Sequence, residues 1–116
     1  MSNHSPLVSV LVPICNVERY LRKCLKFLVR QTLEDIEIIC IDDGSTDASP
    51  QIIAEYAEND ARIKVITKPN SGYGDSMNKG LELAQGEYIA IVESDDFIDE
   101  DGLERMVTLA QDNDVE

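Results

Sequence analysis

The chain has 116 residues, of which 43% are hydrophobic, and its 10 basic and 23 acidic side chains give a formal net charge of −13. This length predicts one domain or part of one, and the acidic excess argues against nucleic acid as a partner, because it repels a phosphate backbone. No segment approaches the ~18 apolar residues of a membrane span, and residues 1–6 form a short tail without signal-peptide features. We therefore expect a cytoplasmic protein with no membrane span in this chain.

Three cysteines, Cys15, Cys24 and Cys40, lie within or beside apolar segments. Their number is odd, and they lack the paired spacing of metal ligands. We expect small buried side chains in a reducing compartment.

The first half of the chain alternates between hydrophobic patterns typical of strands and of helices. Residues 7–14 are apolar on both alternating faces apart from Ser9, which is typical of a central parallel strand, and Pro13 marks its end. Residues 17–31 follow with apolar positions at helical spacing. A second strand is predicted over 36–41, and a second helix begins with Ser49 as N-cap and Pro50 at the first helical position, ending near Asn59.

The first predicted helix carries half of the basic residues of the chain: Arg19, Arg22, Lys23, Lys26 and Arg30. This face could be a phosphate-binding or membrane-binding patch. A solvated helix face is the favoured interpretation, because the apolar side is no wider than core packing needs.

The second half continues the alternation. Residues 63–66 predict a short, half-polar strand near a sheet edge, and a glycine-containing loop over 68–75 precedes a third helix with Met77, Leu81 and Ala84 on its buried side. Gly86 ends that helix. Residues 88–92 predict a buried fourth strand, and Leu103, Met106, Val107 and Ala110 describe the buried face of a last helix.

Four strand-helix repeats predict an α/β fold, a Rossmann-like parallel sheet with right-handed crossovers. Such sheets bind ligands at the carboxyl ends of their strands. By analogy with the common strand order 3-2-1-4, Pro13, Asp43 and the acidic run 93–96 would surround one crevice.

Two of the predicted strands are followed by paired carboxylates. The second strand leads into Asp42-Asp43, and the fourth leads through Glu93-Ser94 into Asp95-Asp96. Adjacent residues in extended chain point in opposite directions, so we expect Asp95 and Asp96 to do different jobs: one accepts hydrogen bonds from a ribose and the other ligates metal. Mg²⁺ or Mn²⁺ would bridge a phosphate ligand to so acidic a chain. The later acids, 99–104, are expected in a solvated loop and helix start. No calcium loop, dinucleotide fingerprint or Gly-Lys-Ser/Thr phosphate loop is present.

Five segments together resemble glycosyltransferase family 2: Val8–Asn16, Gln31–Leu33, Ile39–Asp47, Asn78–Gly80 and Gly86–Asp96. The resemblance implies a GT-A type fold over residues 7–116. It also implies inverting transfer of a sugar from a nucleotide-diphosphate donor, usually a UDP-sugar, to a carbohydrate or lipid-linked acceptor with Mn²⁺ or Mg²⁺. A longer protein of this family could associate peripherally with a membrane.

By the same resemblance, Pro13 and Asp43 contact the nucleotide, Asp95 lies nearer the ribose and Asp96 is the metal ligand. Glu93 stands where many members have Asp, and no role is assigned to it. The family's acceptor half, which carries the general base, is missing, so we expect this chain to be the N-terminal, donor-binding half and incomplete for turnover.

Two alternatives belong to other classes. A receiver-type phosphoacceptor domain suits the length, acidity and α/β alternation, but it needs an Asp after the third strand, where Ile66-Thr67-Lys68 stand. The second alternative is a binding module that holds a nucleotide-sugar and catalyses no reaction.

Overall fold

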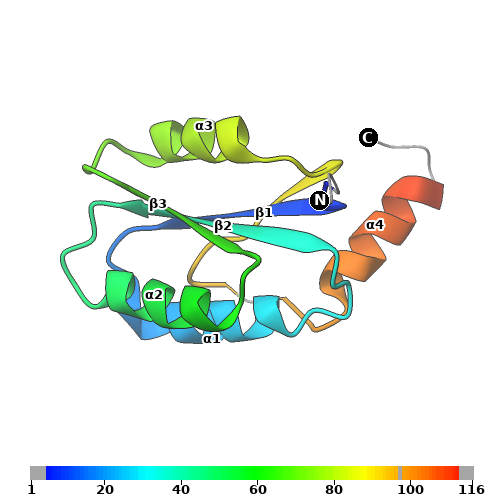
Figure 1. Ribbon diagram of the computed structural model, residues 1–116, viewed down its shortest axis with the longest axis horizontal. Coiled ribbons are helices and arrows are strands. Elements are labelled where there is room, and N and C mark those ends of the chain that lie inside the picture. The colour runs from blue at the N-terminus through cyan, green and yellow to red at the C-terminus, as the bar shows by residue number, and fades with distance from the viewer. Residues whose placement is uncertain (1–4, 97, 113–116) are drawn as a thin grey trace.

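The computed structural model describes residues 5–96 and 98–112, and it confirms the predicted alternation of strands and helices (Figure 1). In chain order the elements are β1 (Val8–Ile14), α1 (Glu18–Val29), β2 (Ile36–Asp43), α2 (Ser49–Asn59), β3 (Ile63–Lys68), α3 (Tyr73–Leu83), β4 (Tyr88–Ile91) and α4 (Gly102–Asp112). Every helix in this part of the chain is too short or too polar to cross a membrane.

The strands form one parallel sheet in the order β3-β2-β1-β4, which confirms the order expected by analogy. β1 is central, with Val12 opposite Cys40 of β2 and Val10 opposite Ala90 of β4. Because all four strands run the same way, their carboxyl ends lie together, at the left of Figure 1. The acidic segments that follow β2 and β4 therefore reach the same edge of the sheet.

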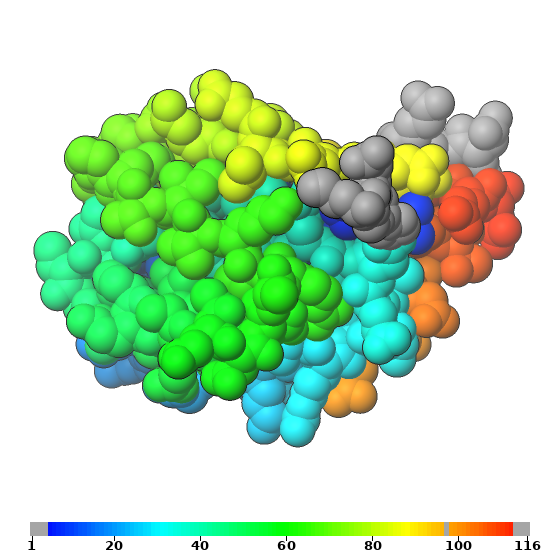
Figure 2. Space-filling model, in the orientation of Figure 1, coloured from blue at the N-terminus to red at the C-terminus, as the bar shows by residue number. Residues whose placement is uncertain are grey.

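Helices cover the two faces of the sheet unequally. α1 and α2 lie on one face, and buried residues of α4 join the same core, whereas α3 lies alone on the other face (Figure 1) and forms the upper left of the space-filling view (Figure 2). The smaller core beneath α3 consists of Leu11, Ile39, Ile41 and Met77. A Cβ at Gly80 of α3 would lie 3.2 Å from the side chains of Leu11 and Ile41, so glycine allows this helix to approach the sheet closely.

The start of α2 differs by one residue from the prediction. Ser49 is the first helical residue and Ala48 occupies the N-cap, so Pro50 is the second helical residue rather than the first. The Ser49 hydroxyl is used elsewhere, because its Oγ accepts a hydrogen bond from the backbone N–H of Val17 at 3.2 Å. It thus connects the start of α2 to the start of α1.

The prediction of a buried fourth strand holds on one face only. β4 is an edge strand, and although Ala90 and Val92 are buried, Ile89 and Ile91 are 43% and 52% exposed. α3, the helix on the face that carries Ile89 and Ile91, packs over β1 and β2 rather than over β4. Leu81, predicted on the buried side of α3, is also exposed.

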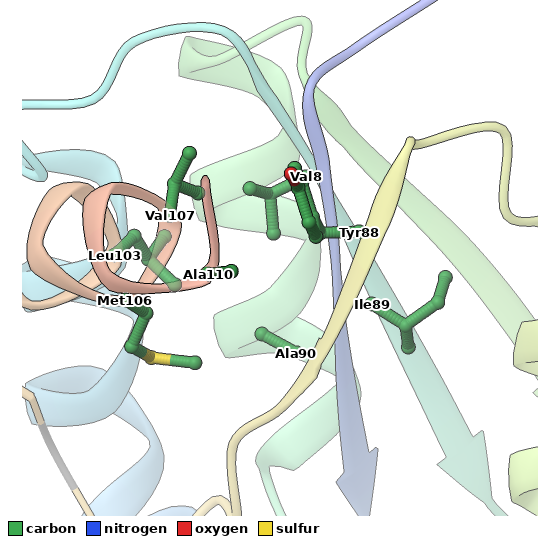
Figure 3. A pocket seen from close by; sticks show the side chains of 8 residues that line it. All are labelled: Val8, Tyr88, Ile89, Ala90, Leu103, Met106, Val107 and Ala110. Atoms are coloured by element: carbon green, nitrogen blue, oxygen red, sulfur yellow. The ribbon is translucent and has the colours of Figure 1, made fainter. Parts of the chain in front are cut away.

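A small apolar groove separates α4 from β4 (Figure 3). Its volume is about 160 Å³, and Leu103 and Val107 are buried in its wall. Met106 is half exposed at this groove, although the helical pattern predicts it inside. Ile89 points away from α4, to the opposite face of the sheet (Figure 3). No lining residue carries a formal charge at neutral pH.

A buried polar cluster lies toward the amino ends of the strands, on the α3 face. Glu37 of β2 accepts hydrogen bonds from the Ser9 hydroxyl, from Lys64 Nζ at 2.6 Å and from the Gln85 backbone N–H at 2.7 Å. Gly86 N–H donates in turn to Ser9 Oγ at 2.8 Å. Burial alone would raise the pKa of Glu37, but the bonds from Lys64, Ser9 and Gln85 together lower it. This cluster connects three strands with the segment that enters β4.

Candidate functional site

An open crevice of about 260 Å³ lies at the carboxyl edge of the sheet. It is formed by the ends of β1 and β2, the start of α3 and the turn after β4. Three of the four residues predicted for the site, Pro13, Asp43 and Asp95, line it together. The full lining is Pro13, Ile14, Cys15, Val17, Asp43, Tyr73, Ser76, Glu93, Ser94 and Asp95. Segments up to about 80 residues apart in the sequence thus meet where parallel α/β sheets bind ligands.

Asp43, the last residue of β2, is almost fully buried and held by four hydrogen-bond donors. Its Oδ1 accepts from the ammonium of Lys68 and from the Ser71 backbone N–H at 2.8 Å, and its Oδ2 accepts from the Gly72 N–H at 3.1 Å. The Asn70 amide donates to the backbone carbonyl of Asp43 at 3.2 Å. The Lys68 ammonium and the Ser71 amide hold the pKa of Asp43 below its usual range, so the residue is an oriented carboxylate.

Lys68 and Asp75 extend this network, and reasoning from the sequence missed both. Lys68 Nζ donates to Ser71 Oγ at 2.6 Å and lies 3.3 Å from Asp75 Oδ2, while Ser71 Oγ donates to Asp75 at 2.6 Å. A signal was available, because Lys68 ends a strand of the same sheet. The argument that places Asp43 at the ligand edge applies equally to Lys68.

The acidic run after β4 forms a tight turn, in which the Asp96 N–H donates to the Glu93 carbonyl at 3.0 Å. Asp95 lines the crevice and Asp96 does not, and both residues are exposed. The Glu93 side chain accepts a hydrogen bond from the Tyr73 hydroxyl at 3.0 Å. That bond raises the pKa of Tyr73 and joins the start of α3 to the acidic turn.

The residue types of the acidic turn fit a metal that is shared with phosphate. Within residues 5–96 and 98–112, no three His, Cys, Asp or Glu side chains gather closely enough to hold a metal by themselves. Mg²⁺ bound to phosphates takes only one or two protein carboxylates, so two neighbouring aspartates suffice for such a site.

Ser76, on the first turns of α3, lines the crevice with a buried hydroxyl. The side chain is 1% exposed, and its Oγ is the one buried side-chain oxygen or nitrogen in the described residues without a hydrogen-bond partner. Leaving a buried polar group unpaired costs free energy, and functional sites are where such groups are found. A ligand in the crevice would supply the missing partner.

The loops around the crevice are fixed to one another through their backbones. Asn16, in a left-handed conformation at φ 53°, accepts hydrogen bonds at Oδ1 from the N–H groups of Thr46 (2.7 Å) and Asp47 (3.2 Å). A Cβ at Gly44 would lie 2.6 Å from the backbone nitrogen of Asn70, so only glycine fits there.

Cys15 corrects one expectation about the cysteines. Cys24 and Cys40 are buried as predicted, and burial raises the pKa of each thiol to about 12. Cys15 is instead exposed in the crevice, because it follows the last residue of β1 and has left the sheet.

Comparison with known proteins decides the family. The sequence model described as glycosyl transferase family 2 matches residues 9–116, nearly the whole chain. The chain belongs to this glycosyltransferase family. EpsH of Bacillus subtilis is 51% identical over 108 residues, which cover 93% of this chain and 31% of EpsH. The glycosyltransferase GlyG of Streptococcus pneumoniae is 41% identical over 113 residues, covering 97% of this chain and 38% of GlyG.

The fold agrees with that of solved glycosyltransferases. TarS 1–349 of Staphylococcus aureus, in complex with UDP-GlcNAc, superposes with a TM-score of 0.84 at 33% identity, over 90% of this chain and 31% of TarS 1–349. The GT-A type fold expected for this glycosyltransferase family member is therefore confirmed, and the receiver-type alternative is dropped. The chain spans about a third of the length of these relatives.

Proposed function

We propose that this chain is the donor-binding portion of a glycosyltransferase that moves a sugar from a nucleotide-diphosphate sugar to an acceptor. The observation that carries the proposal is the crevice itself, where Pro13, Asp43 and Asp95 meet beside the unpartnered hydroxyl of Ser76. UDP is the proposed nucleotide, supported by the UDP-GlcNAc complex of TarS. The proposed acceptor is a saccharide or a lipid-linked carbohydrate, with inversion at the transferred carbon, as in the family that the sequence resembles.

Each residue of the crevice has a proposed role in binding the donor. Asp43 accepts a hydrogen bond from the nucleobase, Pro13 lies against the nucleotide, and Asp95 accepts from the ribose. Ser76 forms a hydrogen bond with the bound nucleotide. These roles need no rearrangement of β1 and β2, whose ends are fixed by the sheet.

Mn²⁺ or Mg²⁺ is the proposed cofactor, held by Asp96 with the diphosphate of the donor. Such a cation neutralises the negative charge of a departing nucleoside diphosphate. With a net charge of −13, the chain needs this compensation to accept a second polyanion. The acidic turn supplies oxygen ligands of the kind these hard cations prefer.

We further propose that these 116 residues bind the donor without transferring its sugar efficiently. Of the carboxylates that line the crevice, Asp43 is held by Lys68 and backbone amides, Glu93 accepts from Tyr73, and Asp95 has the proposed ribose role, so we assign none of them as the general base. The longer relatives carry additional chain. A nucleotide-sugar-binding module without chemistry is the second candidate, because no carboxylate of the crevice lining is assigned as a base.

Calorimetric titration of the chain with UDP, first with Mn²⁺ and then with chelator, tests the donor site. We expect binding that requires the metal and that disappears in the variant Asp96→Asn but persists in Asp112→Asn, which removes an equal charge from the far end of α4. A folded chain that binds UDP under neither condition would contradict the proposal. Incubation with UDP-sugars and saccharide acceptors separates the candidates: slow donor hydrolysis indicates a competent metal site, and efficient transfer would contradict the claim of incompleteness.

A further inference from the structure

Lys68 is an unusual lysine, because its side chain is only 8% exposed. Lysine is among the residues least often buried, unless it is paired. Here its ammonium contacts two carboxylates, of Asp43 and Asp75, and the hydroxyl of Ser71. It lies at the end of β3, outside the crevice lining but directly behind Asp43.

The contacts of Lys68 determine which oxygen of Asp43 a ligand can use. Lys68 and the Ser71 N–H both occupy Oδ1, whereas Oδ2 accepts from the Gly72 N–H alone. A carboxylate has about four acceptor positions, two on each oxygen, so Oδ2 has capacity for one more donor. Because Asp43 lines the crevice, the oxygen left for a ligand is Oδ2.

We propose that Lys68 is a specificity-determining positioning residue, which holds Asp43 as an oriented carboxylate so that the crevice selects a nucleobase edge that donates an N–H. The inference rests on the proposed nucleotide-binding function. An ionised carboxylate can only accept hydrogen bonds. Uracil offers an N–H at N3, whereas cytosine offers a lone pair at the same position, which a carboxylate repels.

The unpartnered Ser76 hydroxyl, which lines the same crevice, cannot make this distinction. The Ser76 hydroxyl rotates, so it donates or accepts as the ligand requires. Discrimination between the two pyrimidines therefore depends on the protonation state and orientation of Asp43. An Asp43 that gained a proton could donate to cytosine N3, and the preference would be lost.

Lys68 is the cation that opposes this protonation. Burial alone would lower the pKa of Lys68, but Asp43 and Asp75 raise it overall, so the ammonium stays charged. Without Lys68, Asp43 would keep its backbone donors but lose its compensating charge, and its pKa would rise. The other titratable groups that line the crevice are acids or weak acids that do not oppose protonation: Cys15, Tyr73, Glu93 and Asp95.

The chain offers a matched control for removal of this lysine. Lys64 lies on the same strand, four residues earlier, and it too forms an ion pair with a buried carboxylate, that of Glu37. Neither Lys64 nor Glu37 lines the crevice. The variants Lys68→Met and Lys64→Met therefore remove the same charge from the same strand, one behind Asp43 and one about 13 Å away along the strand.

The test is calorimetric titration with UDP and with CDP, in Mn²⁺, between about pH 5.5 and 8. We expect the wild-type chain and Lys64→Met to prefer UDP by about tenfold or more at every pH. In Lys68→Met the affinity for UDP falls about tenfold, and the preference over CDP shrinks further as the pH falls. Lys68→Arg restores a positive charge beside Asp43, so it should keep more of the preference than Lys68→Met does. Circular dichroism checks that each variant is folded.

Several results would overturn the inference. A folded Lys68→Met chain with the wild-type preference, or equal changes in Lys68→Met and Lys64→Met, would show that Lys68 acts only on stability. If Lys68→Met does not fold, Asp43→Asn takes its place, because an amide can present either a donor or an acceptor; an unchanged preference in that variant would contradict the inference. A wild-type chain that binds UDP and CDP equally refutes the inference alone, whereas one that binds neither refutes the proposed function.

Discussion

Substitution of Gly86 by alanine tests the packing of the segment that leads into β4. A Cβ at this position would lie 2.5 Å from the backbone nitrogen of Ser9 and 2.9 Å from the carbonyl carbon of Val8. Ordinary Cβ contacts begin near 3.4 Å, so either the loop or β1 must move by several tenths of an ångström. β1 cannot yield easily, because Ser9 is paired with Glu37 of β2 on one side and with Ile89 of β4 on the other.

The expected loss of unfolding free energy in Gly86→Ala has two parts. Forcing extra atoms into a well-packed site typically costs about 1–3 kcal/mol, and displacement of Gly86 would break its hydrogen bond to Ser9 Oγ, worth about 0.5–1.5 kcal/mol. Gly86→Ala should therefore lower the free energy of unfolding by about 2–4 kcal/mol, a large part of the stability of a domain this size.

Urea unfolding followed by far-ultraviolet circular dichroism measures this difference. The matched control is Gly74→Ala, at the start of α3, where an added Cβ meets nothing within 4 Å and alanine should be neutral or stabilise by about 0.5–1 kcal/mol. Both substitutions restrict the unfolded chain in the same way, so the difference between them isolates the clash. Unfolding free energies within about 0.5 kcal/mol of each other would refute this account of how β4 is held against β1.

Three further predictions concern the crevice and the buried polar cluster. Asp96→Ala should abolish metal-dependent UDP binding and leave the melting temperature unchanged, because the side chain is exposed; a chain that no longer folds would show that Asp96 is structural. Ser76→Ala should weaken UDP binding severalfold without lowering the free energy of unfolding, since the buried hydroxyl has no partner among the described residues; loss of stability with unchanged affinity would exclude it from the site. The pKa of Glu37 is lowered in the folded state, so its contribution to stability is present above its ordinary value of 4.5 and is lost as the pH falls below it. The difference in unfolding free energy between wild type and Glu37→Gln should accordingly shrink in urea titrations below about pH 4.5, and a constant difference would contradict the lowered pKa.

Local sequence patterns determined the elements and the edge at which the site lies. The apolar runs at 8–14 and 36–41 predict strands, because a buried parallel strand must be apolar on both faces, and the residues that end them belong to the ligand edge of any such sheet. That reasoning placed Pro13, Asp43 and Asp95 around one crevice before any distance was known. The strand order came by analogy, since nothing local encodes which strands are neighbours.

Tertiary structure decided the partners of these residues. Asp43 and Lys68 are 25 residues apart, and only the register of β2 against β3 brings the carboxylate to the ammonium. The hydrogen bond between Tyr73 and Glu93 likewise depends on the position of α3 over the sheet. Exposure of Ile89 and Ile91 followed from the place of β4 at the edge, whereas their sequence is that of a buried strand. Hydrophobic periodicity reports what a segment can bury, but which side chains meet, and which faces stay uncovered, depends on packing between segments far apart in the chain.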